Sequence, residues 1–310
     1  MSRTDHTLIV GTRGSLLARS QTQWVIDRIR AAHPGLDIQT EIITTKGDRE
    51  QGKPLPEVGA KGIFTIDLEA ALTDGRIDIA VHSAKDLQAE LTPGLEVLCY
   101  PVREDPRDAW ISPTGTPFEE LPPGSVVGTS SLRRQAQLLA IRPDLKFIPL
   151  RGNIDTRINK TQRGDCAGAV LALAGLRRAK LDGHMTHPFE PEVCLPAPAQ
   201  GALAIEGRAD DARVRAILAA IHDPATATAV ECERAILAEL DAGCRAPIGI
   251  LARVEGDRLR CDARVIDPAG TRQVRASVDV PLADRDSAPQ HILEQLRAGG
   301  AEAIIAACRV

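Results

Sequence analysis

The chain has 310 residues, of which 43% are hydrophobic and 26% charged, and its formal net charge is -4. This length suits two or three domains and needs no disulfide support. Four Phe, two Trp and one Tyr leave little aromatic surface for stacking nucleic-acid bases. The seven scattered cysteines include no Cys-x-x-Cys pair, which argues against a disulfide framework and a cysteine zinc site.

The N-terminal segment carries no pattern of export or membrane insertion. The sequence MSRTDHTLIVGTRGS lacks the apolar core of a signal peptide, and no later run approaches 18 apolar residues. We therefore expect a cytoplasmic protein with no membrane partner.

The first third of the chain alternates strand and helix patterns. In chain order, the pattern predicts a strand at 7–11, a helix at 15–33, a strand at 38–45, a helix at 65–73, and strands at 77–81 and 95–100. The charged, proline-containing segment 103–108 is typical of a linker.

The second third repeats this plan. It predicts strands at 125–128, 147–150 and 168–173, with helices at 131–141 and 153–162. Residues 10–16 (VGTRGSL) echo residues 127–132 (VGTSSL), and each reads as strand, Gly-Thr, Ser and helix. The echo indicates either duplication of an α/β unit or a chance match.

The last third changes character after a proline-rich crossing at 195–207. Helices are predicted at 209–221 and 225–240, an antiparallel meander at 248–254, 258–266 and 272–280, and a final helix at 288–306. This order predicts a small α+β domain distinct from the α/β part.

Positive charge is concentrated between residues 131 and 180, where 11 Lys and Arg face 3 Asp. Arginine binds carboxylate or phosphate through paired hydrogen bonds, so a ligand with several anionic groups is indicated. The alternative is a solvated basic face, which we expect for Arg142, Lys146, Lys160 and Arg163. Arg151 differs because it follows the strand FIPL, and ligands of open α/β sheets bind at the carboxyl ends of strands.

The two Gly-Thr turns place Ser15 and Ser131 at helix N-termini, which favour anions. Each serine could instead serve only as an N-cap. Arg13 beside one turn and Arg133-Arg134 beside the other favour ligand binding. Asp86, in VHSAKD, follows a strand end, where its carboxylate could stabilise a cation or relay protons; the alternative is a surface pair with Lys85.

Two loops carry further candidate groups. Cys244 lies in the Gly/Pro-containing loop 241–247 beside Arg245, which favours an exposed, reactive thiol. The other cysteines lie in apolar contexts, where cysteine behaves as a small hydrophobic residue. The loop 59–64 carries Lys61 and Phe64 between glycines and lacks the spacing of a phosphate-cradling loop. The histidines show no metal-ligand spacing, so no metal is expected.

Taken together, these segments resemble the porphobilinogen deaminase (hydroxymethylbilane synthase) family. The matching segments, in chain order, are GTRGSLLARSQ (11–21), GAKGIF (59–64), VHSAKD (81–86), REDPRDAW (103–110), VGTSSLRRQ (127–135), LRGNIDTR (150–157), LALAGLRR (171–178), LPAPAQGALAIE (195–206) and AGCRAPIG (242–249). Nine matches in order make the resemblance specific.

The resemblance implies a fold and a reaction. Two periplasmic-binding-protein-like α/β domains face a cleft, and a small C-terminal α+β domain carries the cofactor. The expected domains are 1–101 plus 201–221, 106–196, and 224–310. The implied reaction is the head-to-tail condensation of four porphobilinogen molecules with release of ammonia, followed by hydrolysis to the linear tetrapyrrole. The implied cofactor is a dipyrromethane held by a thioether, and a monomer is expected.

The resemblance also implies roles for individual residues. Asp86 matches the catalytic aspartate, which stabilises positive charge as ammonia leaves. The implied cofactor ligands are Cys244 (the covalent thioether), Ser83, Lys85, Thr129, Ser131, Arg133, Arg134 and Arg151. The implied substrate-binding residues are Arg13, Ser15, Arg157, Arg178, Gln200, Lys61 and Phe64. The chain departs from the family pattern at Ala60, Ile66, Leu87-Gln88 and Arg245, without removing any of these groups.

Two other functional classes remain as alternatives. A non-catalytic module could bind a small anion in the same cleft without chemistry, although the presence of both Asp86 and Cys244 argues against it. The basic stretch could bind nucleic acid, but the negative net charge and scarce aromatics oppose this. We therefore expect no nucleic-acid partner.

Overall fold

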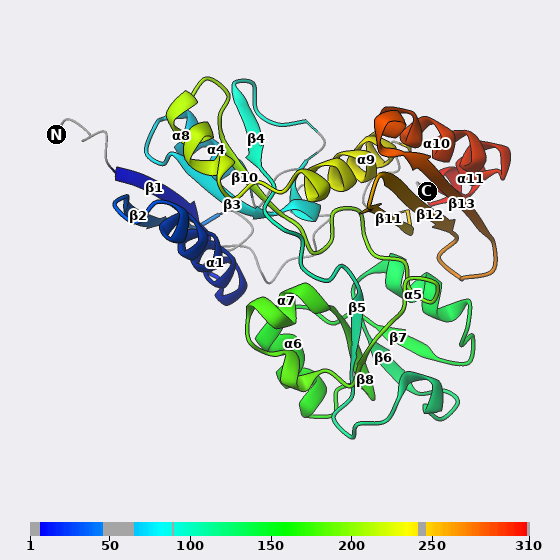
Figure 1. Cartoon of the computed structure of the whole chain (residues 1–310). Helices are drawn as coiled ribbons and strands as arrows, with labels where there is room; N and C mark the ends of the chain where they lie inside the picture. The colour runs from blue at the N-terminus through cyan, green and yellow to red at the C-terminus, as the bar shows by residue number, and fades with distance from the viewer. Residues whose placement is uncertain (1–6, 46–64, 89, 241–245, 309–310) are drawn as a thin grey trace. The chain divides into compact units, whose positions relative to one another are not determined.

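The structure is a computed structural model that describes residues 7–45, 65–88, 90–240 and 246–308. The chain divides into two compact units (Figure 1). Unit 1 comprises Met1–Arg103 and Ala202–Ala227, and unit 2 comprises Glu104–Gly201 and Thr228–Val310. Within the described ranges, every helix is too short or too polar to cross a membrane.

Unit 1 is built on a five-stranded sheet. Its strand order is β2 (Asp37–Ile42), β1 (Thr7–Thr12), β3 (Ile79–Ser83), β10 (Leu203–Arg208) and β4 (Leu95–Cys99). Strands β2, β1 and β3 are parallel, while β10 runs antiparallel to both of its neighbours. Helices α1 (Leu16–Ala32) and α8 (Ala212–Ala219) share one core with the sheet, and α4 (Ile66–Thr73) shares a second. Helices therefore cover both faces, as the α/β pattern predicted.

The α/β part of unit 2 has a second five-stranded sheet. Its order is β7 (Lys146–Ile148), β6 (Val126–Gly128), β8 (Gly168–Ala172), β5 (Asp108–Ile111) and β9 (His187–Pro188). Helix α5 (Leu132–Leu139) packs Leu138 into one core, while α6 (Ile154–Gln162) and α7 (Leu173–Arg178) pack into the other. Short 3-10 turns are found at Ala84–Asp86, Phe118–Glu120, Asp182–His184 and Leu282–Ser287.

The two sheets have the same topology. In each, three parallel strands are followed by one antiparallel strand and then an edge strand. Strands β1 and β6, which carry the sequence echo, occupy the same position. A Cβ atom on Gly11 would lie 2.3 Å from the Ile77 side chain, and one on Gly128 would lie 2.8 Å from Cys166 Sγ. A side chain at either position would force its neighbour to move, and this shared close packing supports duplication over chance.

The two crossings between the units contain strands that the sequence pattern did not predict. The segment expected to be a linker ends in β5, where Asp108 is fully buried. The proline-rich crossing likewise continues into β10. Each crossing thus supplies the antiparallel strand of the sheet that it enters. The expected linker was wrong at Asp108, and the strand at Leu203–Arg208 was not predicted, because pairing with buried neighbours overrides local composition.

The C-terminal part of unit 2 is an antiparallel meander of β11 (Ile248–Glu255), β12 (Arg258–Ile266) and β13 (Gln273–Pro281). Helices α9 (Pro224–Leu240), α10 (Ala288–Ala298) and α11 (Ala301–Ala307) share its core. The predicted single helix at 288–306 was wrong. Gly299 ends α10, and Gly300 has a positive φ of 84°, a backbone conformation that glycine accepts readily.

Candidate active site

The serine of each Gly-Thr turn caps the helix that follows. Ser15 Oγ accepts from Ala18 N at 3.3 Å, and Ser131 Oγ accepts from Arg134 N at 3.4 Å. In the second turn, Thr129 Oγ1 accepts from Ser131 N at 3.2 Å. A capping hydroxyl that accepts a backbone N–H still has its own O–H to donate. The capping role and the expected contact with an anion are therefore compatible.

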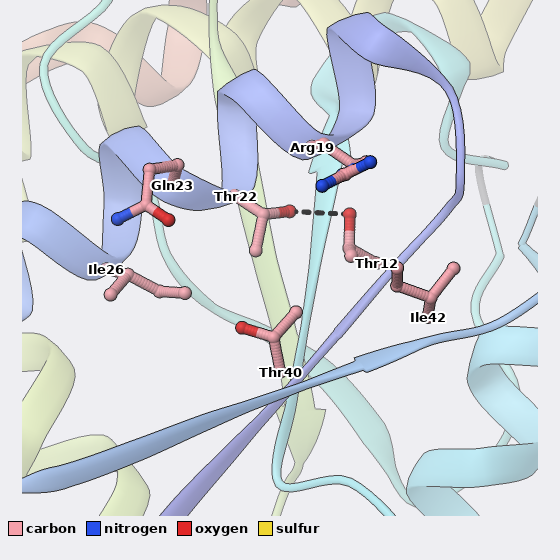
Figure 2. A pocket seen from close by; sticks show the side chains of 7 residues that line it. All are labelled: Thr12, Arg19, Thr22, Gln23, Ile26, Thr40 and Ile42. Carbon is pink, nitrogen blue, oxygen red and sulfur yellow. Dashed lines mark hydrogen bonds between the residues drawn. The ribbon is translucent and has the colours of Figure 1, made fainter.

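A small polar hollow lies where β1 and β2 end, beside the turn that contains Arg13. Figure 2 shows Arg19, Thr22 and Gln23 of α1 around it. Its volume is about 200 Å³, and its full lining is Thr12, Arg19, Thr22, Gln23, Ile26, Thr40 and Ile42. Thr22 Oγ1 donates to Thr12 Oγ1 at 2.7 Å, which ties the start of α1 to the end of β1. This bond fixes the geometry of the turn from which Arg13 projects.

Asp86 lies on an exposed turn at the carboxyl end of β3. The strand ends at Ser83 and continues as a 3-10 turn over Ala84–Asp86. Asp86 and Lys85 are exposed, while Ala84 is fully buried and anchors the turn. The predicted position of Asp86 just beyond a strand end is confirmed. An exposed carboxylate beside a cation remains available to an incoming ligand.

The end of β3, which leads into this turn, is held by buried residues that the sequence pattern did not single out. Gln21 Nε2, on α1, donates to Ser83 Oγ at 2.8 Å. On the other face of the sheet, His82 Nε2 lies 3.0 Å from Glu206 Oε2 of β10. The available signal for Glu206 was a single acidic residue directly after the apolar run ALAI (202–205). Buried acids of this kind are rare without a partner.

In unit 2, the predicted arginine pair lies inside the protein around Asp108. Arg133 and Arg134 are each 6% exposed. Asp108 Oδ2 accepts from Arg133 Nη1 at 2.7 Å, and Oδ1 accepts from Arg134 Nε and Nη2 at 2.9 and 2.7 Å. Gln200 Nε2 also donates to Oδ1, at 2.8 Å. Burial by itself would raise the pKa of Asp108, but the two guanidinium charges outweigh it and hold that pKa well below its ordinary value.

The charges of Arg133, Arg134 and Asp108 do not cancel. Two guanidiniums and one carboxylate leave one positive charge. Arg134 Nη1 donates to Val170 O at 2.9 Å, and Arg133 Nη1 donates to Leu195 O at 2.7 Å, so further contacts fix both side chains to neutral carbonyl groups. A rigid site with an excess positive charge suits an anionic group.

The remaining predicted arginines of unit 2 lie near strand and helix ends. Arg151 is exposed and follows β7 by three residues. Arg157 Nε donates to Gly152 O at 2.8 Å, and Arg178 Nη2 donates to Gly201 O at 2.8 Å. Of the four residues expected to form a solvated face, Arg142 does not: it binds Asp144 at 2.6 Å and the carbonyl groups of Glu119 and Leu121, so it holds a loop.

The structure thus groups the predicted residues on the two units as follows. Unit 1 carries Arg13, Ser15, Ser83, Lys85 and Asp86; unit 2 carries Thr129, Ser131, Arg133, Arg134, Arg151, Arg157, Arg178 and Gln200. Lys61, Phe64 and Cys244 lie outside the described residues.

The six described cysteines lack the solvent exposure that a reactive thiol requires. Cys99, Cys166, Cys194, Cys232, Cys261 and Cys308 are all buried. Burial raises the pKa of Cys99 to about 12 and is also the largest cause that raises the pKa of Cys194 to about 12. A thiol with so high a pKa carries very little thiolate at neutral pH and reacts slowly. The prediction that these cysteines are hydrophobic packing residues is confirmed.

The fold is α/β, and the basic and hydroxyl groups at its strand and helix ends suit an anionic small molecule. Comparison with known families gives the particular family. Residues 8–216 match the model of the porphobilinogen deaminase dipyrromethane cofactor binding domain, and residues 227–298 match that of the porphobilinogen deaminase C-terminal domain. The chain belongs to the porphobilinogen deaminase family and is a transferase of porphyrin biosynthesis.

Curated relatives agree over nearly the whole chain. A porphobilinogen deaminase of Syntrophotalea carbinolica is 44% identical over 300 residues, covering 97% of this chain and 95% of the relative. One from Desulforudis audaxviator is 48% identical over 281 residues, covering 91% of each. One from Roseiflexus sp. is 49% identical over 253 residues, covering 82% of this chain and 84% of the relative. These matches do not support the non-catalytic alternative.

A solved structure also shows a weaker likeness. The periplasmic aliphatic sulphonate binding protein SsuA from Escherichia coli covers 70% of this chain and 67% of its own, at 13% identity and a TM-score of 0.41. The predicted fold class, two α/β domains and a small C-terminal α+β domain, is confirmed by the sheet topology and the two family models.

Proposed function

We propose that this chain condenses four porphobilinogen molecules head to tail, releasing ammonia at each step, and then hydrolyses the product to the linear tetrapyrrole. A bound dipyrromethane cofactor would supply the free pyrrole carbon to which the first ring is joined, and each ring added would supply that carbon for the next. The observation that carries the proposal is the exposed Asp86 carboxylate, held at a strand end in a chain whose cofactor-binding domain matches the family.

Asp86 is the proposed catalytic residue. As the amine leaves porphobilinogen, positive charge develops on the pyrrole, and a nearby carboxylate stabilises that charge. The same carboxylate accepts a hydrogen bond from a pyrrole N–H and so orients the ring. Lys85, on the same turn, and Ser83, at the end of β3, would bind the carboxylate arms of the cofactor.

Unit 2 supplies the remaining proposed ligands. Each pyrrole carries an acetate and a propionate arm, so every added ring brings two carboxylates. Cofactor arms would bind Thr129, Ser131, Arg133, Arg134 and Arg151, and substrate arms would bind Arg13, Ser15, Lys61, Phe64, Arg157, Arg178 and Gln200. The excess positive charge around Asp108 and the free O–H of Ser131 support this assignment.

Cys244 is the proposed attachment point of the cofactor. The burial of the six described cysteines supports this choice, because their thiols are enclosed within cores. We also propose the three domains 1–101 plus 201–221, 106–196 and 224–310, a monomeric state and a cytoplasmic location.

The test combines mass and turnover. Purified protein should give a coloured adduct with Ehrlich's aldehyde reagent, carry a mass excess of two pyrrole units, and release ammonia from porphobilinogen. Cys244→Ser should lose both the excess mass and the activity, and Asp86→Asn should keep the cofactor but lose turnover. An active protein without the mass excess would contradict the proposal.

A further inference from the structure

Two buried side chains hold the end of β3 from opposite faces of the sheet. His82 and Ser83 are consecutive, so their side chains point to opposite faces. Gln21 binds Ser83 from α1, and Glu206 binds His82 from β10. The His82–Glu206 contact joins the strand that leads to Asp86 to the strand supplied by the return crossing.

Glu206 occupies an environment that disfavours a carboxyl group. It is 0% exposed, and although Oε2 contacts His82, Oε1 finds no hydrogen-bond partner among the described residues. A buried pair of this kind adds little net stability compared with apolar side chains of the same size. An unsatisfied buried oxygen is also unfavourable. Stability alone therefore gives no reason for a glutamate at this position.

The contact is placed to fix the turn that carries Asp86. Ala204 pairs with His82 and Leu203 with Ser83, and Ala84 N donates to Ala202 O at 3.1 Å. The backbone of β10 therefore follows β3 as far as the first residue of the turn. Beyond it, Lys85 and Asp86 are exposed. On the α4 face of β3, His82 is the last side chain before the turn begins, and Glu206 holds it.

We propose that Glu206 is a positioning residue for the condensation reaction and acts through His82 on the turn that holds Asp86. The inference rests on the proposed role of Asp86. Fixing the imidazole sets the end of β3, and the end of β3 sets where the Asp86 carboxylate meets the pyrrole. Displacement of a reacting group by about 1 Å can reduce a rate by roughly a hundredfold.

The experiment compares the holoenzyme with Glu206→Gln, which keeps the shape of the side chain and replaces its carboxyl group with an amide. We expect kcat for porphobilinogen to fall at least tenfold, while KM stays within twofold and the cofactor remains attached by intact mass. The midpoint of thermal unfolding of the variant should stay at that of the parent protein although kcat falls. A kcat within twofold of the parent, or a loss explained by a missing cofactor, would overturn the inference.

Glu69→Gln is the matched control. Glu69 is buried in the same unit at 4% exposure, Oε2 accepts from Thr92, and within the described part of the chain Oε1 has no partner. The substitution is the same and the side chain is also buried, but it lies on α4 and contacts Thr92 in place of His82. Its kcat should stay within twofold of the parent. An equal fall of kcat in both variants would show a general effect of burial and overturn the inference.

A second variant tests the same link from the other side. His82→Gln should reduce kcat to a similar degree, and the double variant should be no slower than the slower single one, because both changes break one contact. If Glu206→Gln does not fold, His82→Gln alone decides, and full activity in it would overturn the inference. Full activity in Asp86→Asn would instead contradict the proposed function.

Discussion

The carboxylate of Asp108 holds the guanidinium of Arg134 through two hydrogen bonds to a single oxygen, from Nε at 2.9 Å and from Nη2 at 2.7 Å. Arg133 binds the second oxygen, so one fully buried acid orders two adjacent arginines. The arginines cannot turn toward solvent without breaking these bonds. Unit 2 therefore holds this positive charge in place before any ligand arrives, which lowers the entropy cost of binding.

Replacement of Asp108 should lower the free energy of unfolding far more than replacement of an exposed acid. Asp108→Asn leaves two buried guanidiniums without a counter-ion, and breaking a buried pair in this way costs about 3–5 kcal/mol. Urea denaturation measures the loss. Asp144→Asn breaks the exposed pair with Arg142 in the same unit and should hardly move the midpoint. Equal shifts in the two variants would contradict this prediction.

The stability of the protein should depend on pH through Asp108. Although burial favours a higher pKa, Arg133 and Arg134 hold the pKa of Asp108 below the value of about 3.9 expected for the unfolded chain. The unfolded state then binds more protons, so this contribution is complete above about pH 4 and is lost as the pH falls further. The free energy of unfolding should decline more steeply in acid for the parent than for Asp108→Asn. If the free energy of unfolding fell equally with pH in the parent and in Asp108→Asn, this prediction would be wrong.

Thiol reactivity should identify the attachment cysteine. The described cysteines are buried, and burial raises the pKa of Cys99 to about 12. Protein produced without porphobilinogen should therefore show one fast-reacting thiol toward an aromatic disulfide reagent at pH 8. Cys244→Ser should show none, and neither should the holoenzyme, because its sulfur is a thioether. A fast thiol that persists in Cys244→Ser would refute the assignment.

Arg151 should contribute to binding of carboxylate arms, whereas Arg163 should not. Both are exposed in unit 2, but Arg151 follows β7, while Arg163 follows α6 at its carboxyl end. A charge-assisted hydrogen bond contributes about 1.5–3 kcal/mol. Arg151→Ala should therefore lower kcat/KM at least tenfold, and Arg163→Ala should stay within twofold. Steady-state kinetics with porphobilinogen distinguishes them, and equal effects would mean general charge attraction.

Sequence periodicity predicted the strands and helices whose apolar faces alternate regularly. The helix beginning after Ser15 and the strand ending before Asp86 were both found within two residues of their expected bounds. The Gly-Thr echo by itself fitted either duplication or chance. The structure places it on the equivalent strands β1 and β6, where a Cβ atom on either glycine would crowd a neighbouring side chain.

Three features could not be predicted from local pattern. Strand β5 is short and begins with Asp108, whose charge is typical of a loop until its arginine partners are known. Strand β10 follows a proline-rich segment and contains Glu206, whose partner His82 lies 124 residues earlier. Arg142 likewise resembled a solvated residue because its carbonyl partners lie more than 20 residues away.

The sequence by itself determined the types of groups present, namely the arginines, the helix-capping serines and the strand-end aspartate, because local spacing sets which residues share a turn. Only the tertiary structure decided which of these charges are buried and which face solvent. Asp108 and Asp86 are both acids beside basic residues, yet one is enclosed by two guanidiniums and the other is exposed on a turn. Pairing between distant strands creates that difference, because it decides which side chains lose contact with water.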